Sequence, residues 1–411
     1  MRYFDCVVIG AGAAGLMCAA TAGQRGRRVL VVDHANKVGK KILMSGGGRC
    51  NFTNQWVEPA NFLSANPHFC ISALKRFSQY DFLSLVDKYQ LAYHEKTLGQ
   101  LFCDNRAKDI LNILLAECEA GEVTIETRCE VQHISQLNPT NSLAELEDTE
   151  TNTARFELQT ALGPVRCQSL VVATGGPSIP TLGATGFGYD LARQFGLRVT
   201  DLQASLVPFT LKGERLALAQ SLAGVALPVS ISCGNQTFKE ALLFTHKGLS
   251  GPAVLQISNY WHPGEAVQIN FLPEQDLSAL VREWQQAGEK AELKTLLSRL
   301  LPKRFVLAWL AFPELQSLVI KPVAQLSHTD IATLVSVFQS WSCVPAGTEG
   351  YKTAEVTRGG VCTDQISSKT FETKSVAGLY FIGEVLDVTG WLGGFNFQWA
   401  WSSGWCAGQY V

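Results

Sequence analysis

The first 33 residues constrain the fold of this chain more than any other stretch. An apolar run at 7–9 leads into the pattern Gly-Ala-Gly-Ala-Ala-Gly at 10–15, and a run of small residues continues to Gln24. A second apolar run at 29–32 ends in Asp33. A strand that enters G-x-G-x-x-G, a helix of small residues and a second strand that ends in an acid together predict the dinucleotide-binding βαβ unit.

Each glycine of this pattern has its own physical role. Gly10 permits the tight turn, Gly12 lets a pyrophosphate approach the backbone, and Gly15 lets the helix pack closely on the strand. The free N–H groups at the start of the helix are expected to bind the phosphates. We expect Asp33 to accept hydrogen bonds from the ribose hydroxyls of an adenosine.

The C-terminal part of the chain predicts the other half of the same domain. An apolar strand at 376–382 leads to Gly383 and Glu384, and Gly393 and Gly394 open an apolar C-terminal helix. The acid can lie near the ribityl or pyrophosphate region of a flavin, and the helix start can stabilise negative charge on a reduced isoalloxazine. One complete fingerprint fits an enzyme with one tightly held FAD and a transient reductant.

The residues between the two ends are expected to form inserted domains, because 411 residues exceed what one hydrophobic core usually serves. Short β-like runs predict a β-barrel-like or sandwich insert over 201–275, and a helical insert is predicted over 276–344. The fold class is therefore α/β. A Rossmann-like FAD-binding domain is built discontinuously from 1–200 and 345–411, and substrate sites are common at such domain junctions.

Hydrophobic periodicity predicts further elements of the first domain. Helices are expected over 68–91, 107–120 and 189–195. Strands are expected over 123–134, 156–160 and 168–173, and a polar hairpin or loop over 139–153. The last of these strands ends before Gly175 and returns the chain to the main sheet beside the cofactor. No buried strand precedes the glycines at 183–188, so they indicate a turn and a helix cap rather than a second nucleotide site.

Composition excludes several function classes. The net charge of −2 and the pI of about 6.4 argue against broad non-specific binding of nucleic acid, although the basic stretch at 293–325 can form a local face or simply a solvated helix surface. Twelve cysteines without a C-x-x-C pattern exclude disulfide-reductase chemistry and predict buried, reduced thiols in a cytoplasmic protein. No signal peptide precedes the first strand, and no apolar run has the roughly 18 residues of a membrane span.

Four further segments carry a resemblance to a known family. They are Ser-Gly-Gly-Gly-Arg-Cys-Asn at 45–51, Phe-Thr-His-Lys-Gly-Leu-Ser-Gly-Pro at 244–252, Thr-Arg-Gly-Gly-Val at 357–361, and Gly-Glu-Val-Leu-Asp through Gly-Gly-Phe-Asn-Phe-Gln within 383–398. With these motifs the chain resembles the HI0933/YhiN-type (BaiN-like) flavoprotein family over essentially its whole length. The resemblance implies an FAD-binding domain of the glutathione-reductase and fumarate-reductase type, interrupted by a β-barrel-like part and a helical part.

The resemblance also implies which residues contact a non-covalently held FAD. These residues are Ala14, Asp33, Lys40, Gly47, Gly48, Arg49, Cys50, Asn51, Val131, Glu384, Asn396 and Phe397. The strand ends and turns add Gly10, Gly12, Gly15, Gly175, Gly383 and Gly394. Two positions depart from the usual pattern: Asp33 stands where many FAD proteins have Glu, and Thr389 stands where relatives often have an acid. Either acid can reach a ribose, whereas Thr389 lacks the carboxylate that relatives often have at this position. No metal site is expected.

The activity that the resemblance implies is reduction of an activated carbon–carbon double bond. Relatives are linked to dihydrouridine formation in large-subunit ribosomal RNA and to reduction of steroid enones in bile-acid metabolism. In both reactions reduced flavin gives hydride to the β-carbon of an unsaturated carbonyl, and an acid protonates the α-carbon. The first hypothesis is an ene-reductase for a uridine of 23S ribosomal RNA, with NADH or NADPH as reductant. The others are a reductase of a small apolar enone and a non-catalytic flavin-containing RNA-binding factor.

Three residues are the main candidates for catalysis. Cys50 lies in the glycine loop expected near the flavin and can donate a proton, or it is a thiol that packs inside the loop. His246 can donate the proton, or it is a structural histidine. Arg358 can hold a substrate carbonyl or phosphate, as can Arg49, but each is equally suited to orienting a loop. The residues Tyr351 and Lys352 are weaker candidates.

Overall fold

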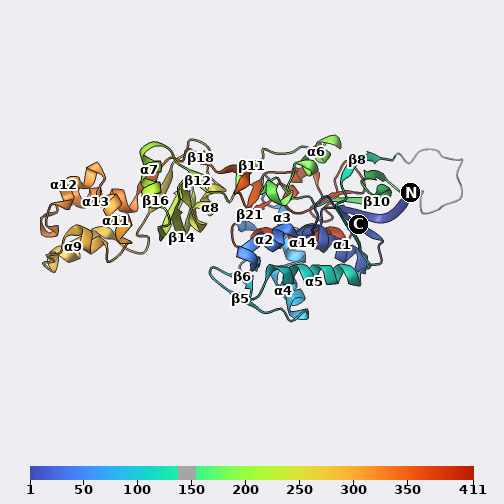
Figure 1. Cartoon of the computed structure of the whole chain (residues 1–411), viewed down its shortest axis with the longest axis horizontal. Coiled ribbons are helices and arrows are strands. Elements are labelled where there is room, and N and C mark those ends of the chain that lie inside the picture. Colours follow the sequence, from blue (N-terminus) through green and yellow to red (C-terminus); the bar gives the residue numbers. More distant parts are fainter. Residues whose placement is uncertain (138–153) are drawn as a thin grey trace. The chain divides into compact units, whose positions relative to one another are not determined.

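The computed structural model describes residues 1–137 and 154–411, which form two compact units (Figure 1). The first unit contains Met1–Gln203 and Val356–Val411, and the second contains Ala204–Glu355. The hairpin or loop predicted over 139–153 lies outside the described residues. The first unit is thus assembled from both ends of the chain, and the second is a continuous insertion.

A seven-stranded sheet forms the centre of the first unit. Its strands have the order β7-β2-β1-β10-β9-β8, and β20 also pairs with β10. The bounds are β1 (Arg2–Ile9), β2 (Val29–Asp33), β7 (Thr124–Thr127), β8 (Val131–Gln136), β9 (Phe156–Thr160), β10 (Gly163–Val172) and β20 (Leu379–Phe381). The pairs that involve β1, β2, β7 and β20 are parallel, and β8 and β9 add an antiparallel extension. The strands β1, β10 and β20 end in buried apolar residues, as is typical of parallel strands that are covered on both faces.

The prediction of a single strand over 123–134 is wrong. Residues 124–127 form β7 beside β2, whereas residues 131–136 form β8 at the opposite end of the strand order. Arg128 has a φ of +55° between them, in the left-handed region that turns the chain out of the extended conformation. A continuous run of strand-forming residues thus supplies both ends of the sheet.

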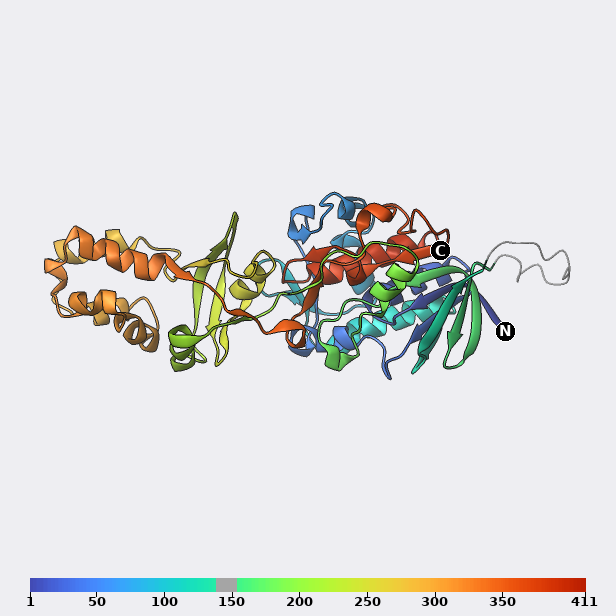
Figure 2. The ribbon, with the colours of Figure 1, turned by 90° about the horizontal axis from the view of Figure 1, so that it is seen from above.

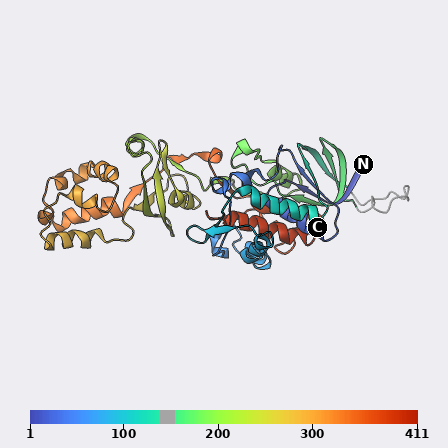
Figure 3. The same ribbon diagram turned by 60° about the horizontal axis from the view of Figure 1, so that its bottom comes forward.

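Three helices of the first unit pack together beside this sheet, α1 (Ala13–Gln24), α5 (Ala107–Ala120) and α14 (Phe395–Gly408) (Figure 3). Small residues allow the helices to approach closely. A Cβ atom at Gly404 would lie 2.5 Å from the carbonyl oxygen of Ala14, and one at Gly23 would lie 2.4 Å from that of Gly121. The small-residue composition of α1 therefore reflects its burial between two other helices.

The helix predicted over 68–91 is two helices, α3 (Phe69–Arg76) and α4 (Gln79–Lys88). The chain is extended at Phe77, and Ser78 caps α4 through a reciprocal pair of hydrogen bonds with Asp81. A local capping box thus outweighs the continuous apolar periodicity.

The remaining elements of the first unit are short. A three-stranded sheet contains β3 (Asn51–Asn54), β6 (Gln100–Cys103) and β5 (Tyr93–Glu95), and β4 (Phe62–Leu63) pairs with β21 (Thr389–Gly390). The others are α2 (Lys40–Met44), η1 (Ser45–Gly48), η2 (Pro59–Asn61), η4 (Pro180–Leu182), α6 (Phe187–Gln194), β19 (Val356–Arg358), η8 (Thr363–Gln365) and η9 (Gly383–Val385). The strand β11 (Gln203–Ser205) follows at the end of the leading segment.

An antiparallel sheet forms the centre of the second unit, in the order β17-β16-β13-β14-β15-β12-β18. Its strands are β12 (Phe209–Thr210), β13 (Ala226–Cys233), β14 (Gln236–Phe244), β15 (Gly248–Ser250), β16 (Val267–Asn270), β17 (Trp341–Cys343) and β18 (Gly347–Thr348). Among the described residues its two end strands do not pair with each other, so the sheet is open and not a closed barrel. The end strands come from 341–348: β17 lies within the stretch predicted to be helical over 276–344, and β18 follows it.

The second unit also contains helices, and most of them (orange) lie together to one side of this sheet (Figure 2). They are α7 (Gly213–Ser221), α8 (Pro252–Ser258), α9 (Leu277–Gln286), α10 (Leu293–Leu297), α11 (Lys303–Leu310), α12 (Gln316–Val319) and α13 (His328–Gln339), with η5 (Pro313–Leu315), η6 (Val323–Gln325) and η7 (Gly350–Lys352). Phe305 and Trp309 stack at 4.2 Å between ring centroids, and both contact Phe271. This aromatic cluster joins α11 to the end of β16.

Two chain-wide features complete the description. All twelve cysteines lie within the described residues, and all are buried and free of disulfides. No helix in the described parts combines the length and apolar character that crossing a bilayer requires.

Candidate functional site

The glycine pattern begins where β1 meets α1. Gly10 has a φ of +111°, and its N–H donates to the carbonyl oxygen of Val32 at 2.8 Å. A Cβ atom at Gly10 would lie 2.5 Å from the carbonyl oxygen of Ala173, and one at Gly15 would lie 1.9 Å from that of Gly10. Protein packing alone therefore requires glycine at these two positions.

Gly12 differs from both neighbours in the pattern. It precedes α1 as the N-cap residue with a φ of −91°, and its position has no side-chain cap. A Cβ atom there would have no heavy atom within 4 Å among the described residues. Packing does not require glycine here, so its presence fits a ligand that approaches this backbone. A pyrophosphate at the start of α1 would meet that description, because free N–H groups and the helix dipole attract anions.

The carboxylate of Asp33 is fixed at the end of β2. One oxygen accepts a hydrogen bond from the N–H of Ala11 and the other from the N–H of Ala35, each at 2.8 Å. A carboxylate has about four acceptor sites, so two backbone bonds leave capacity for ribose hydroxyls. The predicted contact residues Ala14, in the first turn of α1, and Val131, the first residue of β8, are 6% and 9% exposed. Any contact they make with a ligand is therefore small.

Glu384 is the centre of a polar cluster that follows β20. One carboxylate oxygen accepts a hydrogen bond from Lys41 Nζ at 2.8 Å. The other accepts from the N–H of Thr357 at 3.0 Å and from Ser178 Oγ at 3.1 Å. Lys41 Nζ also donates to Ser178 Oγ at 2.6 Å. A Cβ atom at Gly175 would lie 3.4 Å from Glu384, so this glycine lies beside the cluster.

Sequence reasoning missed Lys41 and Ser178. The resemblance pointed to Lys40, whereas the lysine that contacts Glu384 is the next residue in α2. A helix of five residues is too short for periodicity to separate two adjacent lysines. The sequence identifies Thr357 only as a member of the motif at 357–361. In the structure its Oγ1 is buried and has no hydrogen-bond partner in the described chain.

The glycine loop at 45–51 presents an open face. Gly47 and Gly48 have φ values of +66° and +88°, and a Cβ atom at either would meet no described atom within 4 Å. Arg49 is exposed beside them. Asn51, in the amide orientation that satisfies both its ends, accepts from the N–H of Gly394 at 3.2 Å. The loop is therefore tied to the start of α14 while its glycines stay accessible.

Cys50 does not share that open face. It is 0% exposed, so protein atoms surround it on every side. Burial raises the pKa of its thiol to about 12. The geometry contradicts a thiol that protonates a substrate or contacts FAD directly. It favours the alternative interpretation, a thiol that packs inside the loop.

The start of α14 is built by backbone contacts. Gly394 has a φ of +95°, and a Cβ atom there would lie 2.3 Å from the carbonyl oxygen of Thr53. The amide of Asn396 accepts from the N–H of Gly390 at 2.8 Å and donates to that residue's carbonyl oxygen at 2.9 Å. Phe397 stacks on Trp401 at 5.5 Å. The predicted residues of this helix thus hold its first turn in place. Gly383, also predicted, is buried at the start of η9.

The candidate catalytic residues lie in different units. Arg358 is the last residue of β19 and follows Thr357, whose N–H donates to the Glu384 carboxylate. The guanidinium of Arg358 donates to Gln203 Oε1. His246 belongs to the second unit, where it is exposed at the turn between β14 and β15. The weaker candidates Tyr351 and Lys352 are also in the second unit, on η7. Of these residues, Arg358 belongs to the same unit as the Glu384 cluster, and it directly follows Thr357 of that cluster.

Two further findings bear on the chemistry. Among the described residues no group of three or more His, Cys, Asp or Glu side chains could hold a metal ion. The open backbone at Gly12, the Asp33 carboxylate and the Glu384 cluster follow the ends of β1, β2 and β20 in the seven-stranded sheet, and the start of α14 follows β21 of the short β4–β21 pair. They fit the phosphate, ribose, ribityl and isoalloxazine parts of an extended dinucleotide such as FAD.

Comparisons with known proteins agree with this geometry. The family model for the HI0933-like protein Rossmann domain matches residues 4–410. A ribosomal RNA dihydrouridine synthase of Escherichia coli is 53% identical over 410 residues, which are 100% of this chain and 98% of that protein. A 3-dehydro-bile acid delta(4,6)-reductase of Clostridium scindens is 27% identical over 98% of this chain and 97% of its own length.

One solved structure also shares the fold. The 3-ketosteroid-delta4-(5alpha)-dehydrogenase of Rhodococcus jostii has a TM-score of 0.51 at 15% identity, over 99% of this chain and 97% of that one. At that identity the likeness concerns the fold alone, a Rossmann-like α/β architecture with an inserted domain.

Proposed function

The chain belongs to the HI0933-like family, and from this premise we propose that it is an FAD-dependent oxidoreductase that reduces a uridine of large-subunit ribosomal RNA to dihydrouridine. The observation that carries the proposal is the 53% identity, over 410 residues, to the Escherichia coli ribosomal RNA dihydrouridine synthase. Reduction of the uracil C5–C6 bond is reduction of an activated double bond, because the bond is conjugated with a carbonyl.

The proposed cofactor contacts follow from the site. The N–H groups at the start of α1 and the open backbone at Gly12 would hold the pyrophosphate, and Asp33 would hold the adenosine ribose. Glu384, oriented by Lys41, would hold the ribityl chain. The start of α14 at Gly394 would face the isoalloxazine. Bound FAD supplies a hydride donor, with NADH or NADPH as the transient source of electrons.

Arg358 is the proposed substrate-orienting residue. Its guanidinium is always charged, so it does not act as an acid, but it can donate a hydrogen bond to a uracil carbonyl oxygen. Its support is its place next to Thr357, whose N–H contacts the Glu384 carboxylate. His246 stays a proposal for the proton donor, since imidazole is the commonest general acid in enzymes.

The experiment uses purified protein and 23S ribosomal RNA that lacks dihydrouridine. The bound flavin is reduced anaerobically with NADPH or NADH, RNA is added, and two quantities are followed: reoxidation of the flavin and the RNA mass gain of two hydrogens. We expect both together. Flavin that stays reduced, with RNA of unchanged mass, would overturn the proposal and leave a non-catalytic RNA-binding role.

A small-molecule enone is the second candidate substrate, because of the bile-acid reductase among the relatives. Its identity to this chain is about half that of the Escherichia coli protein, which is why it ranks second. The same flavin assay distinguishes the two. Rapid reoxidation by a 4-en-3-one steroid and none by RNA would reverse the ranking.

A further inference from the structure

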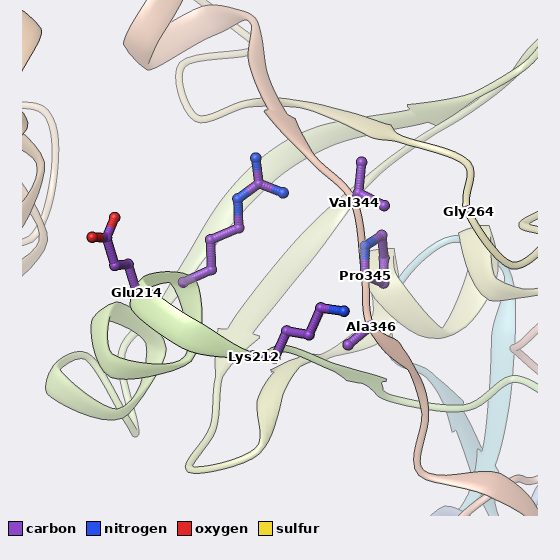
Figure 4. A pocket seen from close by; sticks show the side chains of 7 residues that line it. Lys212, Glu214, Gly264, Val344, Pro345 and Ala346 are labelled. Carbon is purple, nitrogen blue, oxygen red and sulfur yellow. The ribbon is translucent and has the colours of Figure 1, made fainter.

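A pocket of about 540 Å³ lies within the second unit, at the start of α7 (Figure 4). Lys212, Glu214 and Arg215 line one side, Val344–Ala346 line the other, and Gly264 completes the lining. Figure 4 shows the Lys212 ammonium directed toward the Pro345–Ala346 segment, whereas the Glu214 carboxylate points away from it. The pocket therefore has a cationic wall facing an apolar one.

The charges of Lys212 and Arg215 are not neutralised by neighbours. Both side chains are exposed, and neither forms an ion pair with a carboxylate in the portion of the chain that the structure describes. Other cations of this unit do, such as Lys247 with Glu349 at 2.7 Å. Two uncompensated cations on one wall attract an anion with more than one oxygen.

The opposite wall is apolar and held in place. Val344 is 43% exposed and Pro345 is buried, in the segment that joins β17 to β18. The N–H of Ala346 donates to the carbonyl oxygen of Thr210 at 2.8 Å, which fixes this segment against β12. A nucleotide complements both walls, because its phosphate is negatively charged and its sugar edge or base is apolar.

Further positive charge continues along α7. Arg304 is exposed, and its guanidinium donates to the carbonyl oxygen of Ala223, just after the end of this helix. The net charge of −2 for the whole chain does not reveal this local positive charge.

We propose that the pocket between Lys212, Arg215 and Val344–Pro345 binds one nucleotide of the RNA substrate. The two cations hold a backbone phosphate, and the apolar segment packs against the ribose or base. This inference rests on the proposed function and adds an RNA contact outside the flavin-binding unit. A free phosphate or the pyrophosphate of a nicotinamide dinucleotide offers the same charge, so the test separates them from RNA.

Binding of a 23S ribosomal RNA fragment is measured against salt for the wild-type holoenzyme and for Lys212→Ala/Arg215→Ala. Each lost phosphate contact lowers the slope of log K against log salt by about 0.7 to 0.9. Two lost contacts predict about 25- to 60-fold weaker binding at ~0.1 M salt, with the difference vanishing near ~1 M. The flavin spectrum and thermal midpoint check that the variant is folded.

The matched control removes one arginine and one lysine elsewhere in the same unit, as Arg282→Ala/Lys290→Ala. Both are exposed and lie outside the pocket lining. A pocket variant that binds RNA as the control does would overturn the inference. So would unchanged RNA binding with a raised Kd for NADPH or inorganic phosphate.

The two proposals fail in different ways. If the wild-type enzyme neither binds the fragment nor forms dihydrouridine, the proposed function falls and the inference falls with it. If the wild-type enzyme forms dihydrouridine while the pocket variant retains the control's affinity and salt slope, only the inference falls.

Discussion

Replacing Gly12 with alanine tests whether a ligand, and not the fold, requires glycine at the start of α1. A Cβ atom there meets no described atom within 4 Å, and the φ of −91° suits any residue. Alanine is a poorer N-cap than glycine by about 0.5 to 1 kcal/mol. It also restricts the unfolded chain, which stabilises the fold by about 0.4 to 1 kcal/mol. These terms nearly cancel, so the free energy of unfolding should change by less than about 1 kcal/mol.

The cofactor should respond quite differently. A methyl group at Gly12 stands where the pyrophosphate approaches, and displaces it from at least one charge-assisted hydrogen bond worth about 1.5 to 3 kcal/mol. FAD affinity should therefore fall about 10- to 150-fold. Titration of apoprotein with FAD, followed by flavin fluorescence, measures the Kd. Chemical unfolding of the same apoprotein measures its stability.

Two other glycines provide the controls. Gly186 is the N-cap of α6 with a φ of −83° and equally open space, so Gly186→Ala should change neither quantity. Gly15→Ala should destabilise the fold by about 3 kcal/mol or more, because its Cβ atom would lie 1.9 Å from a carbonyl oxygen. FAD binding by Gly12→Ala at the wild-type Kd would refute the reasoning, as would a loss of stability equal to that of Gly15→Ala.

Three further predictions concern single side chains. Lys41→Met removes the cation that orients Glu384 and should weaken FAD binding about tenfold or more, whereas Lys41→Arg keeps the cation and should retain the affinity. Equal FAD affinities for the wild type and both variants would exclude the orienting role. Cys50→Ala should lower the free energy of unfolding by about 1 to 2 kcal/mol and leave turnover within about twofold of wild type. A large fall in kcat at unchanged stability would instead indicate that the thiol takes part in catalysis. Burial opposes ionisation of Glu117, but hydrogen bonds from Lys88, Tyr89 and Gln24 outweigh it and lower the pKa below its ordinary 4.5. Its contribution is therefore complete above pH 4.5 and is lost as pH falls through the folded pKa, so the stability difference between wild type and Glu117→Gln, measured by urea unfolding, should shrink on acidification. A difference that grows toward low pH would contradict this sign.

Patterns that depend on neighbouring residues were readable from the sequence. The G-x-G-x-x-G pattern between two apolar strands predicts the β1–α1–β2 unit, because tight turns and strand periodicity are properties of the local chain. The family motifs similarly identify an FAD-binding domain assembled from both ends of the chain. Asp33 follows from its place at a strand end, without any knowledge of distant contacts.

Other features needed the tertiary structure. Lys41 forms hydrogen bonds with Glu384, 343 residues away in sequence, and with Ser178, 137 residues away. No local pattern distinguishes it from Lys40. The run at 123–134 has uniform strand propensity, yet pairing with different partners divides it between opposite ends of the sheet. Burial of Cys50 likewise depends on what packs over its loop.

The sequence by itself determined the dinucleotide fold, the family and the turns that bring phosphate-binding backbone to the strand ends. The tertiary structure decided which side chains meet, which thiol is sealed from ligands, and where uncompensated charge gathers in the inserted unit. The physical reason is range: backbone conformation responds to adjacent residues, whereas ion pairs, burial and pockets arise when distant segments pack together.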